Sequence, residues 1–169
     1  MSPEILLPLL FMAAFVAGLV DSIAGGGGLI TVPVLMGIGL PPQVALGTNK
    51  LQASFGSGSA MLHFVRARAV KLSDCRSGII WTAVGATLGV VAVQLLDATV
   101  LKQLIPWLLA AIAVYTLLSP SLGAEDSHAR MKPGPFYLLF GLSIGFYDGF
   151  FGPGTGSFWT MALMMLLGC

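Results

Sequence analysis

The stretch DSIAGGGGLITVP, residues 21–33, decides the fold of this chain. A carboxylate and four consecutive glycines stand there inside an otherwise apolar sequence. Each glycine costs about 1 kcal/mol relative to alanine in a helix, so the run predicts a break. The apolar residues 29–39 that follow predict a half-helix, whose first N–H groups and positive dipole end suit an anion. Close helix packing is the alternative, but packing favours small residues three or four apart over a contiguous run.

The composition is that of a membrane protein. Of the 169 residues 56% are hydrophobic and 9% are charged, whereas a soluble domain carries about 25% charged residues. No Asp, Glu, Lys, Arg or His occurs in residues 22–49, 77–96, 103–124 and 149–169. Roughly 20 apolar residues cross a bilayer, so we predict an all-α, polytopic transmembrane bundle with glycine-broken helices. The first apolar segment, residues 5–20, follows Glu4 instead of a basic region, so we expect a retained helix rather than a signal peptide.

Charge predicts the topology and the division of the chain. Residues 66–76 hold three arginines and a lysine against the single acid Asp74, so the positive-inside rule makes this loop cytoplasmic. Residues 77–96 then cross outward and residues 103–118 cross back. We therefore predict a first transmembrane repeat over residues 1–118, a cytoplasmic linker over 119–135, and the start of a second repeat over 136–169.

The two repeats share a motif. GLVDSIAGGGG begins at residue 18 and GFYDGFFGPGTG begins 127 residues later, with three glycines and the acid in register, so that Asp21 matches Asp148. An internal repeat in a membrane protein favours a transporter with its site between the halves, and we favour inverted over parallel repeats. The counterparts of Asn49 and Lys50 would lie beyond Cys169. We expect a second repeat truncated at its C-terminal end, the alternative being an unusually short protein.

Three charged residues lie inside apolar segments: Asp21, Lys50 and Asp148. A charge at the bilayer centre costs at least about 2.5–3.5 kcal/mol, so such residues usually face a cavity or a partner. We favour a role in a substrate or proton path over a structural ion pair. Together with Thr48, Asn49 and the two glycine-rich breaks, Lys50 outlines a site for a small oxyanion. The aspartates could cap the breaks, pair with Lys50, or carry protons.

Other classes of function have little support in this sequence. A net charge of +1 without a basic stripe gives no reason to expect nucleic acid. Cys75 and Cys169 fit no metal or disulfide pattern, and we expect neither a metal nor a cofactor. No Ser-His-Asp or metal-hydrolase arrangement is visible, so we do not expect an enzyme.

The motif of residues 18–60 resembles the first-repeat signature of the TauE/SafE family, and GFYDGFFGPGTGSF resembles its second-repeat signature. The resemblance implies a multi-pass permease of the bacterial inner membrane that exports sulfite, sulfoacetate or related sulfur-containing anions. Carried over motif by motif, it supports a set of predicted substrate-binding residues: Asp21, Gly25, Gly26, Gly27, Gly28, Thr48, Asn49, Lys50, Asp148, Gly152, Gly154, Thr155 and Gly156.

We therefore predict a transporter of small sulfur-containing anions that works by alternating access. The expected partners are the lipid bilayer and a small inorganic or organic anion, and a homo-oligomer stays open. Two alternatives remain. One is a permease for another small ion or metabolite, and the other is a non-transporting membrane fragment or scaffold that needs a partner chain.

Overall fold

The computed structural model describes residues 3–118 and 131–168, and all regular structure in these ranges is helical. This confirms the all-α prediction. In chain order the helices are α1 (Pro3–Ala24), α2 (Gly28–Gly37), α3 (Pro42–Arg66), α4 (Arg76–Gln94), α5 (Ala98–Leu118), α6 (Pro133–Phe150), α7 (Thr155–Ala162) and the π-helical turn η1 (Leu163–Leu167). By length and composition α1, α4 and α5 could each cross a membrane. Residues 119–130 of the predicted linker lie outside the described residues, and its last three belong to α6.

The break predicted at the first glycine run is confirmed. Helix α1 ends at Ala24 and α2 begins at Gly28. Gly25 has a φ of +67°, a left-handed conformation that residues with a side chain rarely adopt. The ten residues of α2 extend about 15 Å, half of the roughly 30 Å hydrocarbon core, so α2 is a half-helix.

Helix α3 carries Thr48, Asn49 and Lys50, the polar residues that the sequence predicts for the site. It starts at Pro42, where the missing N–H of proline costs no helical hydrogen bond. It then runs without interruption for 25 residues to Arg66, where the basic loop begins. It packs against α1 and α2 and also contacts α5.

Helices α4 and α6 form the most extensive helix pair, and glycines make their close approach feasible. A Cβ on Gly145 would lie 2.9 Å from the Cα of Thr82, and one on Gly85 would lie 2.9 Å from the Phe146 nitrogen. Since backbone atoms cannot move aside as side chains do, only glycine fits. Gly141, Gly145 and Gly149 recur every four residues, the spacing of small residues in membrane helix pairs.

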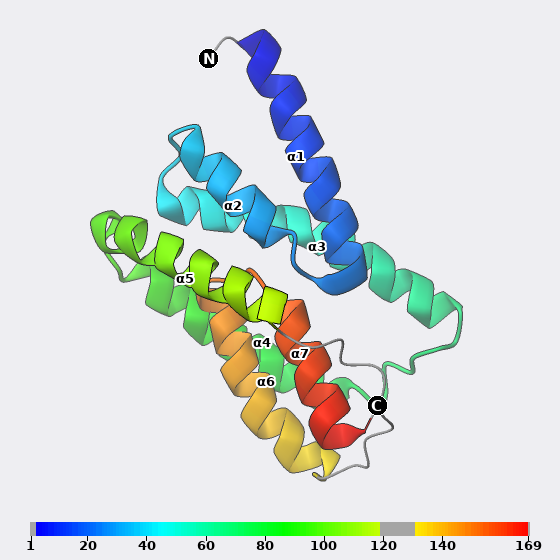
Figure 1. The fold of residues 1–169 in the computed structure, drawn as a ribbon. Helices are drawn as coiled ribbons and strands as arrows, with labels where there is room; N and C mark the ends of the chain where they lie inside the picture. The colour runs from blue at the N-terminus through cyan, green and yellow to red at the C-terminus, as the bar shows by residue number, and fades with distance from the viewer. Residues whose placement is uncertain (1–2, 119–130, 169) are drawn as a thin grey trace.

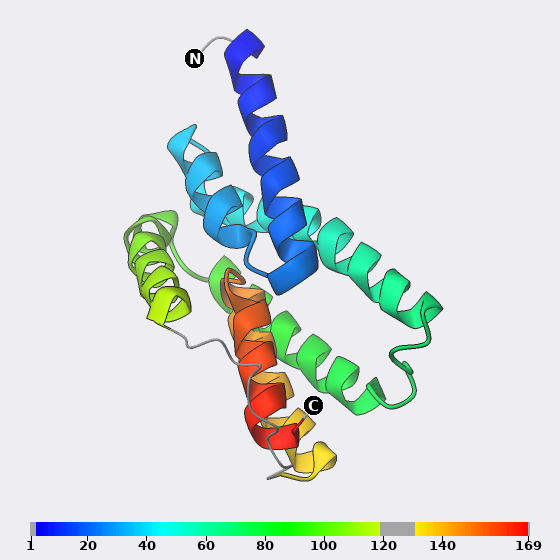
Figure 2. The ribbon, with the colours of Figure 1, turned by 45° about the vertical axis from the view of Figure 1, so that its right-hand side comes forward.

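The second break mirrors the first in an opposed orientation. Helix α6 ends at Phe150 and α7 begins at Thr155, and Gly152 between them has a φ of +98°. Helices α1 and α6 reach the centre from opposite ends of the molecule, and α2 and α7 each return toward the end from which their long helix came (Figures 1 and 2). Inverted repeats would produce this arrangement, and their presence stays a prediction.

A hydrophobic cluster joins the two halves. Phe151 of the second break is 1% exposed and packs with Val32 of α2 and Ile112 of α5. Leu46 of α3 and Val93 of α4 belong to the same cluster, which therefore includes residues of both halves. Lipid is as apolar as these side chains, so close van der Waals packing is what lets this cluster help to hold the second break beside α2.

Candidate substrate site between the two helix breaks

Asp21 caps the first break. It lies in the last turn of α1, is 9% exposed, and accepts a 2.7 Å hydrogen bond at Oδ1 from the Gly27 N–H. A Cβ on Gly27 would lie 2.5 Å from Asp21 Oδ2, so the carboxylate can fold over the break only because residue 27 is glycine. Carboxylates bind backbone N–H groups more strongly than neutral acceptors do. This hydrogen bond is the capping contact, one of the three roles left open, and among the described residues Asp148 rather than Asp21 pairs with Lys50.

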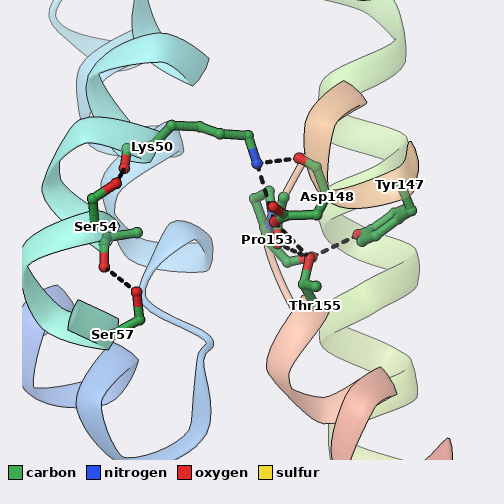
Figure 3. Close-up of polar contacts among 9 residues, drawn as sticks. Lys50, Ser54, Ser57, Tyr147, Asp148, Pro153 and Thr155 are labelled. Carbon is green, nitrogen blue, oxygen red and sulfur yellow. Dashed lines mark hydrogen bonds and ion pairs between the residues drawn. The ribbon is translucent and has the colours of Figure 1, made fainter. Parts of the chain in front are cut away.

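Asp148 has different partners from its counterpart in the first repeat. Lys50 extends from α3 to the second break, where its Nζ lies 3.1 Å from Asp148 Oδ1 and also donates to the backbone carbonyl of Asp148 (Figure 3). The Thr155 hydroxyl lies 3.1 Å from the same Oδ1 and 2.6 Å from the Gly152 carbonyl oxygen. Asp148 therefore pairs with Lys50 and fixes the direction of its ammonium group.

Tyr147 holds the backbone of the second break. Its hydroxyl donates a 2.6 Å hydrogen bond to the Pro153 carbonyl oxygen (Figure 3). Its ring also packs edge-on against Phe158 of α7, with 5.1 Å between centroids. These contacts tie the start of α7 to the end of α6 and so keep the second half-helix in place.

The two breaks touch one another. A Cβ on Gly25 would lie 2.8 Å from the Cα of Gly156, and a Cβ on Gly28 would lie 2.9 Å from Pro153 Cγ. The first turns of α2 and α7 consequently lie together at the centre of the molecule. Several first-turn N–H groups already donate within the breaks, such as that of Ile30 to the Gly27 oxygen and that of Thr155 to the Gly152 oxygen. Each helix N-terminus nevertheless carries about half a positive charge, which both breaks direct to the same region.

A cavity of about 300 Å³ opens at this junction. It combines acids, a lysine, hydroxyl groups and the glycine backbone of both breaks. The lining residues are Asp21, Gly25, Gly28, Asn49, Lys50, Ala53, Ser54, Ser57, Thr82, Asp148, Gly152, Thr155, Gly156 and Trp159. Its volume is at the lower end of the range for ligand sites, which suits a small ligand.

Two oxygens in residues lining this cavity are buried without a hydrogen-bond partner in the described part of the chain: Asp21 Oδ2 and Asn49 Oδ1. Asn49 is 4% exposed, and its Nδ2 lies against the backbone at Gly28. Buried polar atoms almost always have a partner, so these two oxygens are exceptions beside the cavity, and a ligand or water reaches them only after the side chains move.

Most of the predicted site residues come together at this cavity. Those that line it are Asp21, Gly25, Gly28, Asn49, Lys50, Asp148, Gly152, Thr155 and Gly156. Gly26 and Gly27 belong to the same break without lining the cavity, and Gly154, with a φ of +82°, is buried against Ile112. Thr48 is exposed and lines a separate pocket with Thr31 and Gln52.

The predicted set omits Ala53, Ser54, Ser57, Thr82 and Trp159, which also line the cavity. Ser54 and Ser57 stand four and seven residues after Lys50, a spacing that places all three on one face of a helix (Figure 3). This periodicity could have identified them. Thr82 and Trp159 lie on helices whose approach to the cavity no local pattern indicates.

The fold and cavity define a polytopic helical membrane protein with two broken helices around a polar site. The model of the family described as "Sulfite exporter TauE/SafE" matches residues 10–169, and the chain belongs to this family. This confirms the resemblance seen in the sequence.

The relatives are named probable membrane transporter proteins, and three of them show the range of similarity. The one from Haemophilus influenzae is 51% identical over 167 residues, which cover 96% of this chain and 64% of that protein. YfcA of Escherichia coli is 50% identical over 168 residues, 99% of this chain and 62% of that protein. MJ0441 of Methanocaldococcus jannaschii is 29% identical over 161 residues, 90% of this chain and 59% of that protein. The chain thus spans less than two thirds of these relatives' length. No solved structure matches it.

Proposed function

We propose that the protein transports small sulfur-containing oxyanions, such as sulfite or a sulfonate, out of the cell across the bacterial inner membrane. The observation that carries this proposal is the contact between the two helix breaks, which brings two half-helix N-termini to one cavity beside Lys50. Helix N-termini favour anions through their N–H groups and their dipoles. The description of the family supplies the sulfur chemistry and the direction of export.

The cavity can bind an anion although Lys50 is already paired. An ammonium group has three N–H donors, of which two are directed to Asp148. The third has no acceptor among the described residues and is available to a ligand. The hydroxyl groups of Ser54 and Ser57 line the same space but donate to the carbonyl oxygens of Lys50 and Ala53, so they must rotate before they can donate to an anion. The ion pair with Asp148 stabilises the charged ammonium group away from bulk water and fixes its orientation. One N–H donor of this group stays available to the anion.

Alternating access follows from the opposed orientation of the two breaks. In this mechanism the unit of α1 and α2 moves against the unit of α6 and α7, with the cavity between them as the fixed substrate site. The contacts at Gly25 and Gly28 are made of backbone atoms and a proline ring. Rotation of one unit against the other must also break the packing of Phe151 on Val32 and, because α3 packs against α1 and α2, the ion pair of Lys50 with Asp148.

Sulfite efflux from proteoliposomes that contain the protein tests this function. We compare wild type with the double variant Lys50→Met/Asp148→Asn, which removes the ion pair without leaving an unpaired charge. A hydrogen bond to a charged group contributes about 1.5–3 kcal/mol, so we expect binding to weaken about tenfold to hundredfold. Lys102→Met, which removes an exposed lysine on α5, is the control and keeps the wild-type rate. Equal efflux in all three proteins would refute the role of the cavity.

A cation permease is a second candidate, and the two unpartnered acceptor oxygens Asp21 Oδ2 and Asn49 Oδ1 favour it. Oxygen ligands of this type bind hard cations such as Na⁺ or Mg²⁺. Competition separates the two candidates. If sulfonates inhibit sulfite efflux and alkali or alkaline-earth cations do not, the substrate is the anion; inhibition by a cation alone supports the cation permease.

A further inference from the structure

The two aspartates related by the repeat differ in how they are neutralised. Asp148 is 38% exposed and forms an ion pair with Lys50. Asp21 is 9% exposed, and its Oδ1 binds the Gly27 N–H. Its Oδ2 is buried and has no hydrogen-bond partner among the described residues. One acid is thus paired with a cation, whereas the other has a free oxygen in a residue that lines the cavity.

The charged groups around Asp21 are few. Helices α2, α3 and α7 pack against α1, and neither α2 nor α7 contains an ionisable side chain. Helix α3 brings Lys50 to the cavity, and its other basic groups, His63 and Arg66, stand in its last turn. Across the cavity stands Asp148, which holds Lys50. The positive end of α2 is therefore what stabilises an ionised Asp21.

A bound anion competes with Asp21 for that positive helix end. With Lys50, Asp148 and Asp21 all ionised, the cavity carries one net negative charge, and a monovalent anion would raise this to two. Uptake of one proton by Asp21 restores the original charge. The protonated carboxyl group then becomes a donor. Because Oδ2 is buried, the side chain of Asp21 must rotate toward the cavity before the anion can accept this hydrogen bond.

We propose that Asp21 takes up one proton when the cavity binds an anion, so that the protein moves the anion and the proton together. This inference rests on the proposed function and names its coupling ion and the group that carries it. Asp148 is not the proton carrier; it is a positioning residue that orients Lys50. Asp21 and Asp148, which occupy equivalent positions in the two repeats, therefore have different roles.

Infrared difference spectroscopy of the purified protein tests this directly, with methanesulfonate as a probe because it carries no proton of its own at neutral pH. We expect methanesulfonate to produce the carbonyl stretch of a protonated carboxylic acid. Asp21→Asn, which keeps the Oδ1 acceptor for Gly27, lacks this band. Asp97→Asn removes an exposed acid outside the cavity and keeps it. An indicator dye in weak buffer should report uptake of one proton per bound anion.

Several results would overturn the inference. Binding of methanesulfonate without proton uptake, or a band that persists in Asp21→Asn, would refute it while leaving anion transport intact. Binding that requires Na⁺ and takes up no proton would assign the coupling to a cation instead. If neither methanesulfonate binding nor sulfite efflux is found, the proposed function fails together with the inference. If Asp21→Asn does not fold, the proton stoichiometry of the wild type decides alone.

Discussion

Substitution of Gly25 by alanine tests the contact between the two breaks. Alanine at residue 25 must adopt a φ near +67°, which costs about 1–2 kcal/mol for a residue with a Cβ. The added Cβ would lie 2.8 Å from the Cα of Gly156, so one break must move, and such overpacking costs typically about 1–3 kcal/mol. We therefore expect Gly25→Ala to lower the free energy of unfolding by about 2–5 kcal/mol.

Gly39 provides the matched control for this substitution. It also has a positive φ, +93°, and stands just beyond the other end of α2, but a Cβ there would meet nothing within 4 Å. Gly39→Ala should cost only the backbone strain, about 1–2 kcal/mol. Reversible unfolding in mixed micelles, followed by helical circular dichroism, measures both variants. Equal losses of stability in the two would refute the contact between the breaks.

Three further predictions concern the ion pair, the glycine interface and the topology. A double-mutant cycle of Lys50→Met and Asp148→Asn should give a coupling energy of about 1–2 kcal/mol, because the two side chains are only 29% and 38% exposed. A coupling energy of zero would contradict the ion pair. Gly145→Ala should lower the free energy of unfolding by about 1–3 kcal/mol. Gly134→Ala, with nothing within 4 Å of its Cβ, should change it little, and similar losses would count against a tight α4–α6 contact. In a protein with no other cysteine, Cys75 should react with an impermeant maleimide only from the cytoplasmic side, and labelling from outside would reverse the predicted topology.

The breaks could be predicted from the sequence because their cause is local. Four successive glycines disfavour a continuous helix, since each costs about 1 kcal/mol relative to alanine, and Gly152 and Gly154 have a similar effect in the second repeat. The structure adds the reason for particular glycines. Gly27 makes room for Asp21, Gly28 makes room for Pro153, and Gly26 meets only a side-chain atom at ordinary contact distance.

The partner of Lys50 could not be predicted, because it depends on packing between distant segments. Lys50 and Asp148 are 98 residues apart in the chain, and both aspartates were candidates. Asp148 stands in the last turns of α6, whose position is set by its glycine contact with α4. The sequence shows a four-residue spacing of Gly141, Gly145 and Gly149. This spacing predicts a close helix contact but does not identify α4 as the partner helix.

Helical phase explains which polar residues of α3 reach the cavity. Successive residues rotate by about 100° around a helix, so Thr48, two residues before Lys50, points to a different side. Ser54 and Ser57 return to the side of Lys50. Grouping the polar residues by their nearness in sequence therefore included Thr48 and left out the two serines.

Protection of a cavity cysteine by an anion tests the central claim most directly. Ser54→Cys places a thiol on the cavity wall, and Ser59→Cys places one on an exposed part of the same helix outside it, each in a protein without other cysteines. We predict that sulfoacetate slows alkylation of residue 54 by iodoacetamide and leaves the alkylation of residue 59 unchanged, while chloride at equal ionic strength protects neither. Equal alkylation rates at residue 54 with and without sulfoacetate would contradict an oxyanion site between the two helix breaks.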